Sequence, residues 1–210
     1  MAIAKQGING PFSGKVGSII GYELNGQPVM RSVGRRTKPF SELELLNQAK
    51  MKVVSEFLGP INPFVKFGYQ REAPPGSRVG AFQLAQSYVR KNAVELDDER
   101  KPFVNPAKVL ISRGKLEPPL NCTVEREGDR LTLRWEQSGR VGLTDRLMVL
   151  LYDGYSFRYF RQMGAERREQ MEVLEVKLLR FMENPVHVYA AFRHTMRDEI
   201  SDSVYCGMLE

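Results

Sequence analysis

Hydrophobic and polar residues alternate in several short segments of the C-terminal half of the chain. Leu131, Leu133 and Trp135 alternate with polar residues, which is the two-residue period of a strand with one buried face. Similar segments recur with turn residues between them, and seven short strands with an early Trp are typical of an immunoglobulin-like sandwich. The strands are predicted near residues 121–126, 130–136, 145–152, 155–161, 171–179, 186–193 and 200–208.

One part of this half is also compatible with a helix. Residues 166–175 contain several good helix formers, so a helix there is an alternative to the predicted strand.

Helical periodicity replaces alternation in the N-terminal half after residue 40. Ser41 and Glu44 have the spacing of a capping box, in which each residue binds the backbone N–H of the other. Apolar residues then recur every four positions until Gly59-Pro60 ends the helix. Two further helices are predicted at 61–69 and 77–92.

Two short apolar segments flank Asn25-Gly26 near the N-terminus. Asn-Gly tolerates the positive φ angles of a type I′ turn, so residues 18–22 and 28–32 are predicted to form a β-hairpin. An isolated hairpin is marginally stable in water. We therefore expect this hairpin to lie against another surface.

A proline-rich segment separates the two halves. Residues 108–112 are predicted as a short strand, and Leu116-Glu117-Pro118-Pro119 follows as a stiff linker. We place a domain boundary there, between residues 1–115 and 116–210. The predicted fold class is α+β: an N-terminal β-hairpin plus a small helical group, followed by a C-terminal seven-stranded antiparallel β-sandwich.

Charge is distributed unevenly between these halves. Residues 1–115 contain 18 Lys and Arg against 9 Asp and Glu, a net charge of +9. Residues 116–210 contain 13 against 16, a net charge of −3. Opposite charges at two ends of one chain favour association with copies of itself, and a basic half can also attract a polyanion.

The C-terminal half has a proline-rich start, a Trp in its second predicted strand and further strands at regular spacing. With these features residues 116–210 resemble a fibronectin type III module. The resemblance implies a β-sandwich, a fold that hosts many functions. The segments that carry the resemblance are 131–135, 145–152, 186–192 and 201–205.

Three motifs mark the chain as a whole. They are Gly14-Lys15-Val16-Gly17 before a strand that contains Tyr, the helix that begins at Ser41, and residues 110–114 before the sandwich. With them the full chain resembles a bacterial family of about this length that is known only as a domain of unknown function. The resemblance implies no activity.

Residues that carry catalysis in other proteins are scattered here. His187 and His194 lie in or just after the predicted sixth strand, and we expect the side chain of His187 to face solvent. Cys122 and Cys206 lack metal-ligand spacing. Both lie in predicted strands, so two buried thiols are favoured over a disulfide. No catalytic, cofactor-binding or metal-binding residue is predicted, and we expect a protein that is not an enzyme.

Basic residues gather before residue 39, on the hairpin and just after it. Lys and Arg on such a ribbon can bind phosphates while an aromatic ring stacks on bases, and they can equally dock on an acidic protein surface. The leading hypothesis is a structural or assembly protein that self-associates, or docks in a larger particle, by strand addition through this basic arm. Binding of nucleic acid is the alternative. The candidate residues are Lys15, Tyr22, Arg31, Arg35, Arg36 and Lys38.

Two aromatic stretches stand out, at residues 64–69 and 152–160. Packing in the core explains about half of these side chains, and the others are candidates for a face that binds a partner. A basic, Arg-rich stretch follows, and the acidic residues Glu166 and Glu169 within it predict a salt-bridged surface. Its basic residues are Arg158, Arg161, Arg167 and Arg168.

The N-terminus contains no continuous apolar region after its first Lys, and no later run has the length of a membrane span. We expect no signal peptide, a cytoplasmic location at synthesis, and no membrane partner. Incorporation into an assembled particle is compatible with this expectation.

Overall fold

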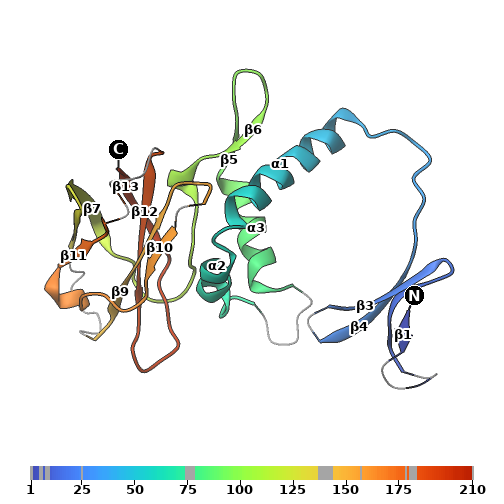
Figure 1. The fold of residues 1–210 in the computed structure, drawn as a ribbon, viewed down its shortest axis with the longest axis horizontal. Helices are drawn as coiled ribbons and strands as arrows, with labels where there is room; N and C mark the ends of the chain where they lie inside the picture. The colour runs from blue at the N-terminus through green and yellow to red at the C-terminus, as the bar shows by residue number, and fades with distance from the viewer. Residues whose placement is uncertain are drawn as a thin grey trace.

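The computed structural model describes the chain except for residues 1, 5, 6, 8, 9, 25, 74–78, 137–143, 157, 178, 180–183 and 210. The fold is mixed α and β, as the sequence predicts. A four-stranded sheet lies at the N-terminal end, three helices lie in the middle, and a four-stranded and a three-stranded sheet lie at the C-terminal end (Figure 1).

The N-terminal sheet is antiparallel, with the order β1-β2-β3-β4. Residues 18–22 and 28–32 largely fall in β3 and β4, which pair from Ile19 with Ser32 to Leu24 with Gln27. Asn25 lies outside the described residues, and so does the predicted type I′ turn. Strands β1 and β2 were not predicted. The four strands are β1 (Ile3–Ala4), β2 (Phe12–Val16), β3 (Ile19–Leu24) and β4 (Gln27–Ser32).

Three helices follow, at α1 (Glu42–Leu58), α2 (Asn62–Tyr69) and α3 (Ala81–Asn92). The predicted capping box is present, because Ser41 Oγ accepts from the Glu44 N–H and the Glu44 carboxylate accepts from the Ser41 N–H. The third helix begins four residues later than predicted. Strands β5 (Val94–Leu96) and β6 (Pro102–Val104) then form a hairpin, followed by the short helix η1 (Pro106–Lys108).

The strand predicted at 108–112 is wrong, because no strand occurs there. The N–H groups of Ile111 and Ser112 donate to Ser203 Oγ, at 2.7 and 3.4 Å. The Arg113 N–H donates to the carbonyl of Gly68 in α2. A Cβ on Gly68 would lie 2.3 Å from the Ile111 carbonyl oxygen, so only glycine permits this close approach. The segment is therefore bound to a side chain and a helix, and not to a strand.

Two antiparallel sheets form the C-terminal part, in the orders β11-β8-β7 and β10-β9-β12-β13. Each of the seven predicted segments overlaps one of these strands. In the segment 166–175, for which a helix was the alternative, only η2 (Arg167–Glu169) is helical, and residues 171–175 form β11. The strands are β7 (Leu120–Glu127), β8 (Arg130–Glu136), β9 (Arg146–Tyr152), β10 (Arg158–Arg161), β11 (Met171–Glu175), β12 (Val186–Arg193) and β13 (Val204–Leu209).

A first hydrophobic core joins these two sheets. Leu131, Leu133 and Trp135 of β8 belong to the same buried cluster as residues of β9 and β12. The ring centroids of Trp135 and Phe192 lie 5.8 Å apart, and the indole N–H donates to the Arg167 carbonyl at 2.9 Å. The alternating apolar residues of β8 are thus buried, as their period indicates.

A second core lies on the other face of β9 and β12, under the helices. The two aromatic stretches meet there, with the ring centroids of Phe64 and Phe160 separated by 4.5 Å. Tyr152 of β9 contacts Phe57 of α1 edge to face, at 5.2 Å. Residues on both sides of the predicted domain boundary therefore share a core. Whether the two halves fold separately stays a prediction.

The Arg-rich stretch is only partly a salt-bridged surface. Arg168 pairs with Glu166 at 2.7 Å at the surface, as predicted. Arg167 is instead 2% exposed and binds Asp145 at 2.9 Å, with its guanidinium over the Phe192 ring. A buried charge needs such a partner, because leaving water is costly for an unpaired ion.

The expectation that His187 faces solvent is corrected. Its neighbours Val186 and Val188 are buried, so His187 does point away from the first core. It is half-buried, however, with Nδ1 3.0 Å from the Tyr205 hydroxyl. Burial lowers the pKa of His187, since a cation is less stable away from water.

The bond between Tyr152 and the helices gives a first prediction. The buried Tyr152 hydroxyl donates to the Phe57 carbonyl at 2.8 Å, so Tyr152→Phe leaves that acceptor without this donor. We expect the free energy of unfolding to fall by roughly 1–2 kcal/mol in a denaturant titration. Tyr155→Phe is the matched control, because Tyr155 is 71% exposed. Equal unfolding midpoints for the two variants would contradict the assigned role.

Candidate functional site

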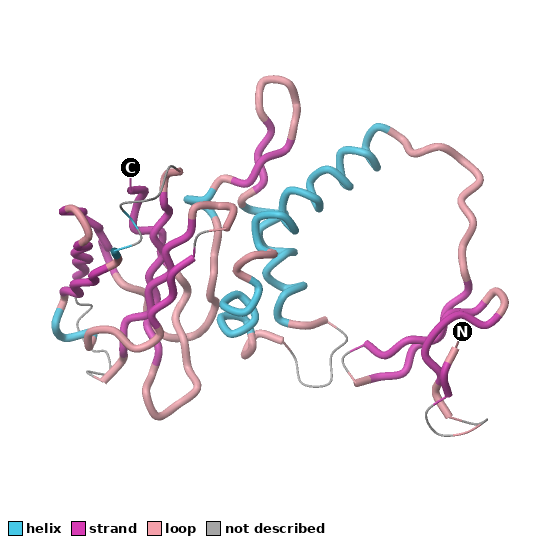
Figure 2. The backbone as a smooth tube through the Cα atoms, viewed as in Figure 1, coloured by secondary structure: helices cyan, strands magenta, loops and turns pink. Residues whose placement is uncertain are grey.

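The N-terminal sheet has almost no core of its own. Gly21 is the one buried residue among the described residues of 2–32. A Cβ on Gly21 would lie 2.8 Å from the ring of Phe12, so glycine lets that ring lie against β3. Figure 2 shows the sheet standing apart from the helices and connected to them by the segment before α1. Both faces of the sheet are therefore available for contact.

One face of the sheet carries three of the candidate residues. Ile20 of β3 lies directly opposite Lys15 on one side and Arg31 on the other. Tyr22 follows two positions after Ile20, so it points to the same face, and the Arg31 guanidinium lies 5.7 Å from the centre of its ring. We call this the basic face, and Val29, opposite Tyr22, completes it.

The opposite face is apolar and exposed. Val16 and Ile19 are directly paired, and Met30 pairs with Gly21 beside them. These three side chains, which we call the apolar face, are 55%, 44% and 69% exposed. An exposed apolar cluster on a sheet with no core is typical of a surface that another protein covers. Sequence reasoning missed this face, although Val16, Ile19 and Met30 share one parity in the strand pairing.

A hollow opens where β2 separates from β3. The pairing of these strands ends at Gly14 with Gly21, and Gly14 has a φ of 117°, a backbone angle that glycine adopts readily. The space is open to solvent, has a volume of about 450 Å³ and is wide enough for a large side chain. It is lined by Pro11, Phe12, Ser13, Tyr22, Glu23, Gly26 and Pro28.

The other three candidate residues lie in the segment that leads to α1. Arg36 is bound in place: it donates to the Pro39 carbonyl, pairs with Glu44 at 2.6 Å and lies 3.9 Å from the Phe40 ring centre. Arg35 and Lys38 are exposed. The structure thus places Lys15, Tyr22 and Arg31 together, and it gives Arg36 contacts that hold the start of a helix.

The start of α1 is also an electrostatic feature. The Arg36 guanidinium lowers the pKa of Glu44, and the Ser41 N–H and hydroxyl lower it further. A carboxylate with a depressed pKa stabilises the fold above its unfolded-state pKa, and this contribution is lost as pH falls through the folded-state value. The carboxylate also lies in the first turn, where the helix dipole favours negative charge.

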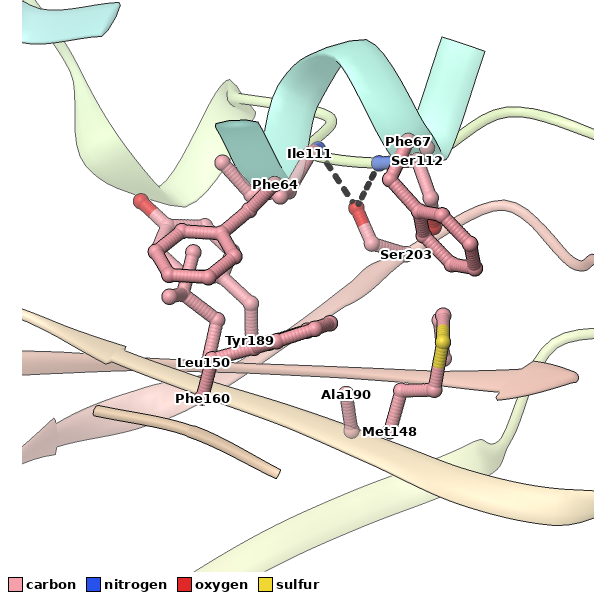
Figure 3. Close-up of a pocket in the computed structure, with 12 residues that line it drawn as sticks. Phe64, Phe67, Ile111, Ser112, Met148, Leu150, Phe160, Tyr189, Ala190 and Ser203 are labelled. Atoms are coloured by element: carbon pink, nitrogen blue, oxygen red, sulfur yellow. Dashed lines mark hydrogen bonds between the residues drawn. The ribbon is translucent and has the colours of Figure 1, made fainter. Parts of the chain in front are cut away.

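A second hollow lies between α2 and the C-terminal sheet β10-β9-β12-β13 (Figure 3). Phe64 and Phe67 cover it from the helix, and Met148, Leu150 and Tyr189 form its floor. Its lining is mostly apolar. The volume in which the centre of a water molecule fits is only about 20 Å³, which is room for about one water. This hollow is a packing gap between two layers, too small for a substrate.

The described residues contain no group of three or more His, Cys, Asp or Glu side chains placed to hold a metal ion. No helix in the described part of the chain is long and apolar enough to cross a membrane.

Comparison with known proteins gives one match. A family model described as a family of unknown function (DUF6266) matches residues 11–207, nearly the whole chain. Searches of curated proteins and of solved structures find no match. The matched range includes the basic face, the apolar face, the three helices and the C-terminal sheets up to Gly207 of β13.

The contacts of Arg36 give a second prediction. Arg36→Ala removes the main cause of the lowered pKa of Glu44, so that pKa should rise toward its ordinary value in an NMR titration of the side-chain carboxyl. Arg35→Ala is the matched control, because it removes one neighbouring charge without touching the Glu44 pair. The same shift in both variants would show that general charge, and not the 2.6 Å contact, controls Glu44.

Proposed function

The chain belongs to this family of unknown function, and we propose that it is a non-enzymatic structural subunit that self-associates through its N-terminal sheet. The supporting observation is the lack of a core in that sheet, where only Gly21 is buried among the described residues. Small sheets need three or more strands with a covered face to be stable. A neighbouring subunit supplies that cover.

The proposed occupant of the sheet is a second copy of the same chain. The N-terminal half carries a net charge of +9 and the C-terminal half −3, so the basic sheet of one copy is attracted to the C-terminal part of another. Such complementarity speeds association and fixes orientation. The apolar face lies on the other side of the sheet, and its burial against a copy supplies most of the free energy of association.

Packing through a face is favoured over strand addition at an edge. β4 is an edge strand of the sheet, and Pro28 within it has no N–H to donate to an added strand. The opposite edge, β1, has only two residues. More contact area than at either edge is offered by the apolar face and by the hollow beside Tyr22. The proposed mode of docking therefore differs from the strand addition that the sequence-based hypothesis included.

We further propose that the C-terminal part is a seven-stranded sandwich of fibronectin type III type, which acts as the rigid body of the subunit. The strand orders β11-β8-β7 and β10-β9-β12-β13 and the shared core around Trp135 support this. A rigid body is what a structural subunit requires, since a docked neighbour then has a fixed position.

Binding of nucleic acid is the second candidate function. Its support is the basic face, where Lys15 and Arg31 lie on either side of Ile20 and Tyr22 lies beside Arg31. Cations next to an aromatic ring can bind a phosphate and stack on a base. The apolar face gives this function no support, because a polyanion would leave it exposed.

Self-association gives a third prediction. In light scattering after size exclusion, the mass of the full chain should rise above that of a monomer as concentration increases. Met30→Asp puts a charge on the apolar face and should weaken association roughly tenfold or more. Met196→Asp is the matched control, because Met196 is 89% exposed and lies in the turn between β12 and β13.

A truncation tests the same proposal without a new charge. Removing residues 2–32 deletes the sheet but keeps Arg36 and its contacts with the start of α1. The truncated chain should stay monomeric at concentrations where the full chain associates. A full chain that is monomeric at every concentration, with a scattering profile in which the sheet lies against its own body, would overturn the proposal.

Nucleic acid binding is tested with a labelled single-stranded oligonucleotide at low salt. Neutralising Lys15 and Arg31 should flatten the salt dependence if the basic face binds phosphates. Our proposal expects no binding that these residues control. Binding with a steep salt slope that the double variant removes would favour the second function.

A further inference from the structure

The chain has two cysteines, separated by 83 residues, and the fold brings them together. The Sγ atoms of Cys122 in β7 and Cys206 in β13 lie 2.7 Å apart, as free thiols. Cys122 is buried and Cys206 is half-buried. Two residues among 210 meet at a single point, which is more than burial of two small hydrophobic side chains requires.

Both cysteines lie at irregularities of their strands. In β7 the pairing shifts between Leu120 and Thr123, so Asn121 and Cys122 face one residue of β8. In β13 the partners step from Tyr205 to Gly207, which leaves Cys206 without a direct partner in β12. A β-bulge redirects the side chain of the extra residue. Two bulges on facing strands therefore turn both thiols toward each other.

The two strands occupy equivalent places in their sheets. β7 is the edge strand of the order β11-β8-β7, and β13 is the edge strand of β10-β9-β12-β13. The contact of the two thiols thus joins the edges of two sheets on the same side of the first core. A covalent bond here would close that side.

We propose that Cys122 and Cys206 form an intrachain disulfide that links the two C-terminal sheets, with a small-molecule disulfide such as oxidised glutathione as the oxidant. The Cys206 thiolate attacks one sulfur of the small disulfide and releases one thiolate. The Cys122 thiolate then attacks the mixed disulfide at Cys206 and releases the second. The two protein thiols lose two protons and two electrons, and the small disulfide becomes two thiols.

Access and acidity determine how fast this occurs. Cys206 is the more exposed thiol, so it meets the oxidant first. The contact with Cys122 and burial raise the pKa of Cys206, which keeps the thiolate fraction small at neutral pH. The rate of oxidation should therefore increase as pH rises, and the bond, once closed, should be slow to reduce.

The test uses the full chain, purified with a reductant and then incubated with oxidised glutathione at mildly alkaline pH. Thiols counted after denaturation should fall from two per chain to none, and the intact mass should fall by two hydrogen atoms. The thermal midpoint should rise by roughly 5–10 °C, because the bond closes a long loop. Digestion should yield a peptide pair that joins Cys122 to Cys206.

Cys122→Ala and Cys206→Ala provide matched controls. Each keeps one thiol, so neither should show the rise in thermal midpoint with oxidant, and at most one glutathione should add. A stable product with two glutathiones, a disulfide-linked dimer, or two thiols that persist in the wild-type chain would each overturn the proposal. The wild-type thiol count and mass decide the question even if a variant does not fold.

Discussion

The central strands β9 and β12 are buried on both faces, and the body of the molecule depends on this. Leu147, Val149 and Leu151 face the core shared with the three-stranded sheet, whereas Leu150 and Tyr152 face the helices. Strands without a solvent face are typical of sheets covered on both sides. If the helices were removed, large apolar and aromatic side chains would meet water. The helices and the two sheets therefore stabilise each other through one pair of strands.

Periodicity predicted the elements better than their partners. The two-residue period around Trp135 and the capping box at Ser41 each describe a local energy balance, and both occur in the structure. The run from Leu147 to Tyr152 in β9 is apolar at every position, so it indicates burial without indicating which element lies against each face. The strand predicted at residues 108–112 is wrong because a residue distant in sequence binds its backbone: the Ser203 hydroxyl accepts from the N–H groups of Ile111 and Ser112.

Composition located the candidate region but could not sort its charges. Arg31 and Arg36 lie five positions apart in the same basic cluster, and the sequence does not distinguish their roles. Strand pairing puts Arg31 beside Tyr22 on an open face, whereas Arg36 folds onto Glu44 and Phe40. The apolar face depends on the register of β2, a strand with no detectable pattern of its own. The face to which each side chain points depends on the register, and a one-residue shift of the register would move every side chain of the strand to the other face.

The connection between the N-terminal sheet and α1 has only a short stretch between the contacts at its two ends. The Val33 N–H donates to the carbonyl of Ser18, in the turn between β2 and β3, and Arg36 is bound to Glu44 at the start of the helix. Only Gly34 and Arg35 lie between these two anchors, and Gly34 has open space around it. Two residues give few backbone dihedral angles, so a rotation at this joint would change the angle of the sheet more than its distance from α1. Copies joined through this sheet would differ in angle far more than in spacing, which would allow one interface to fit assemblies of different curvature.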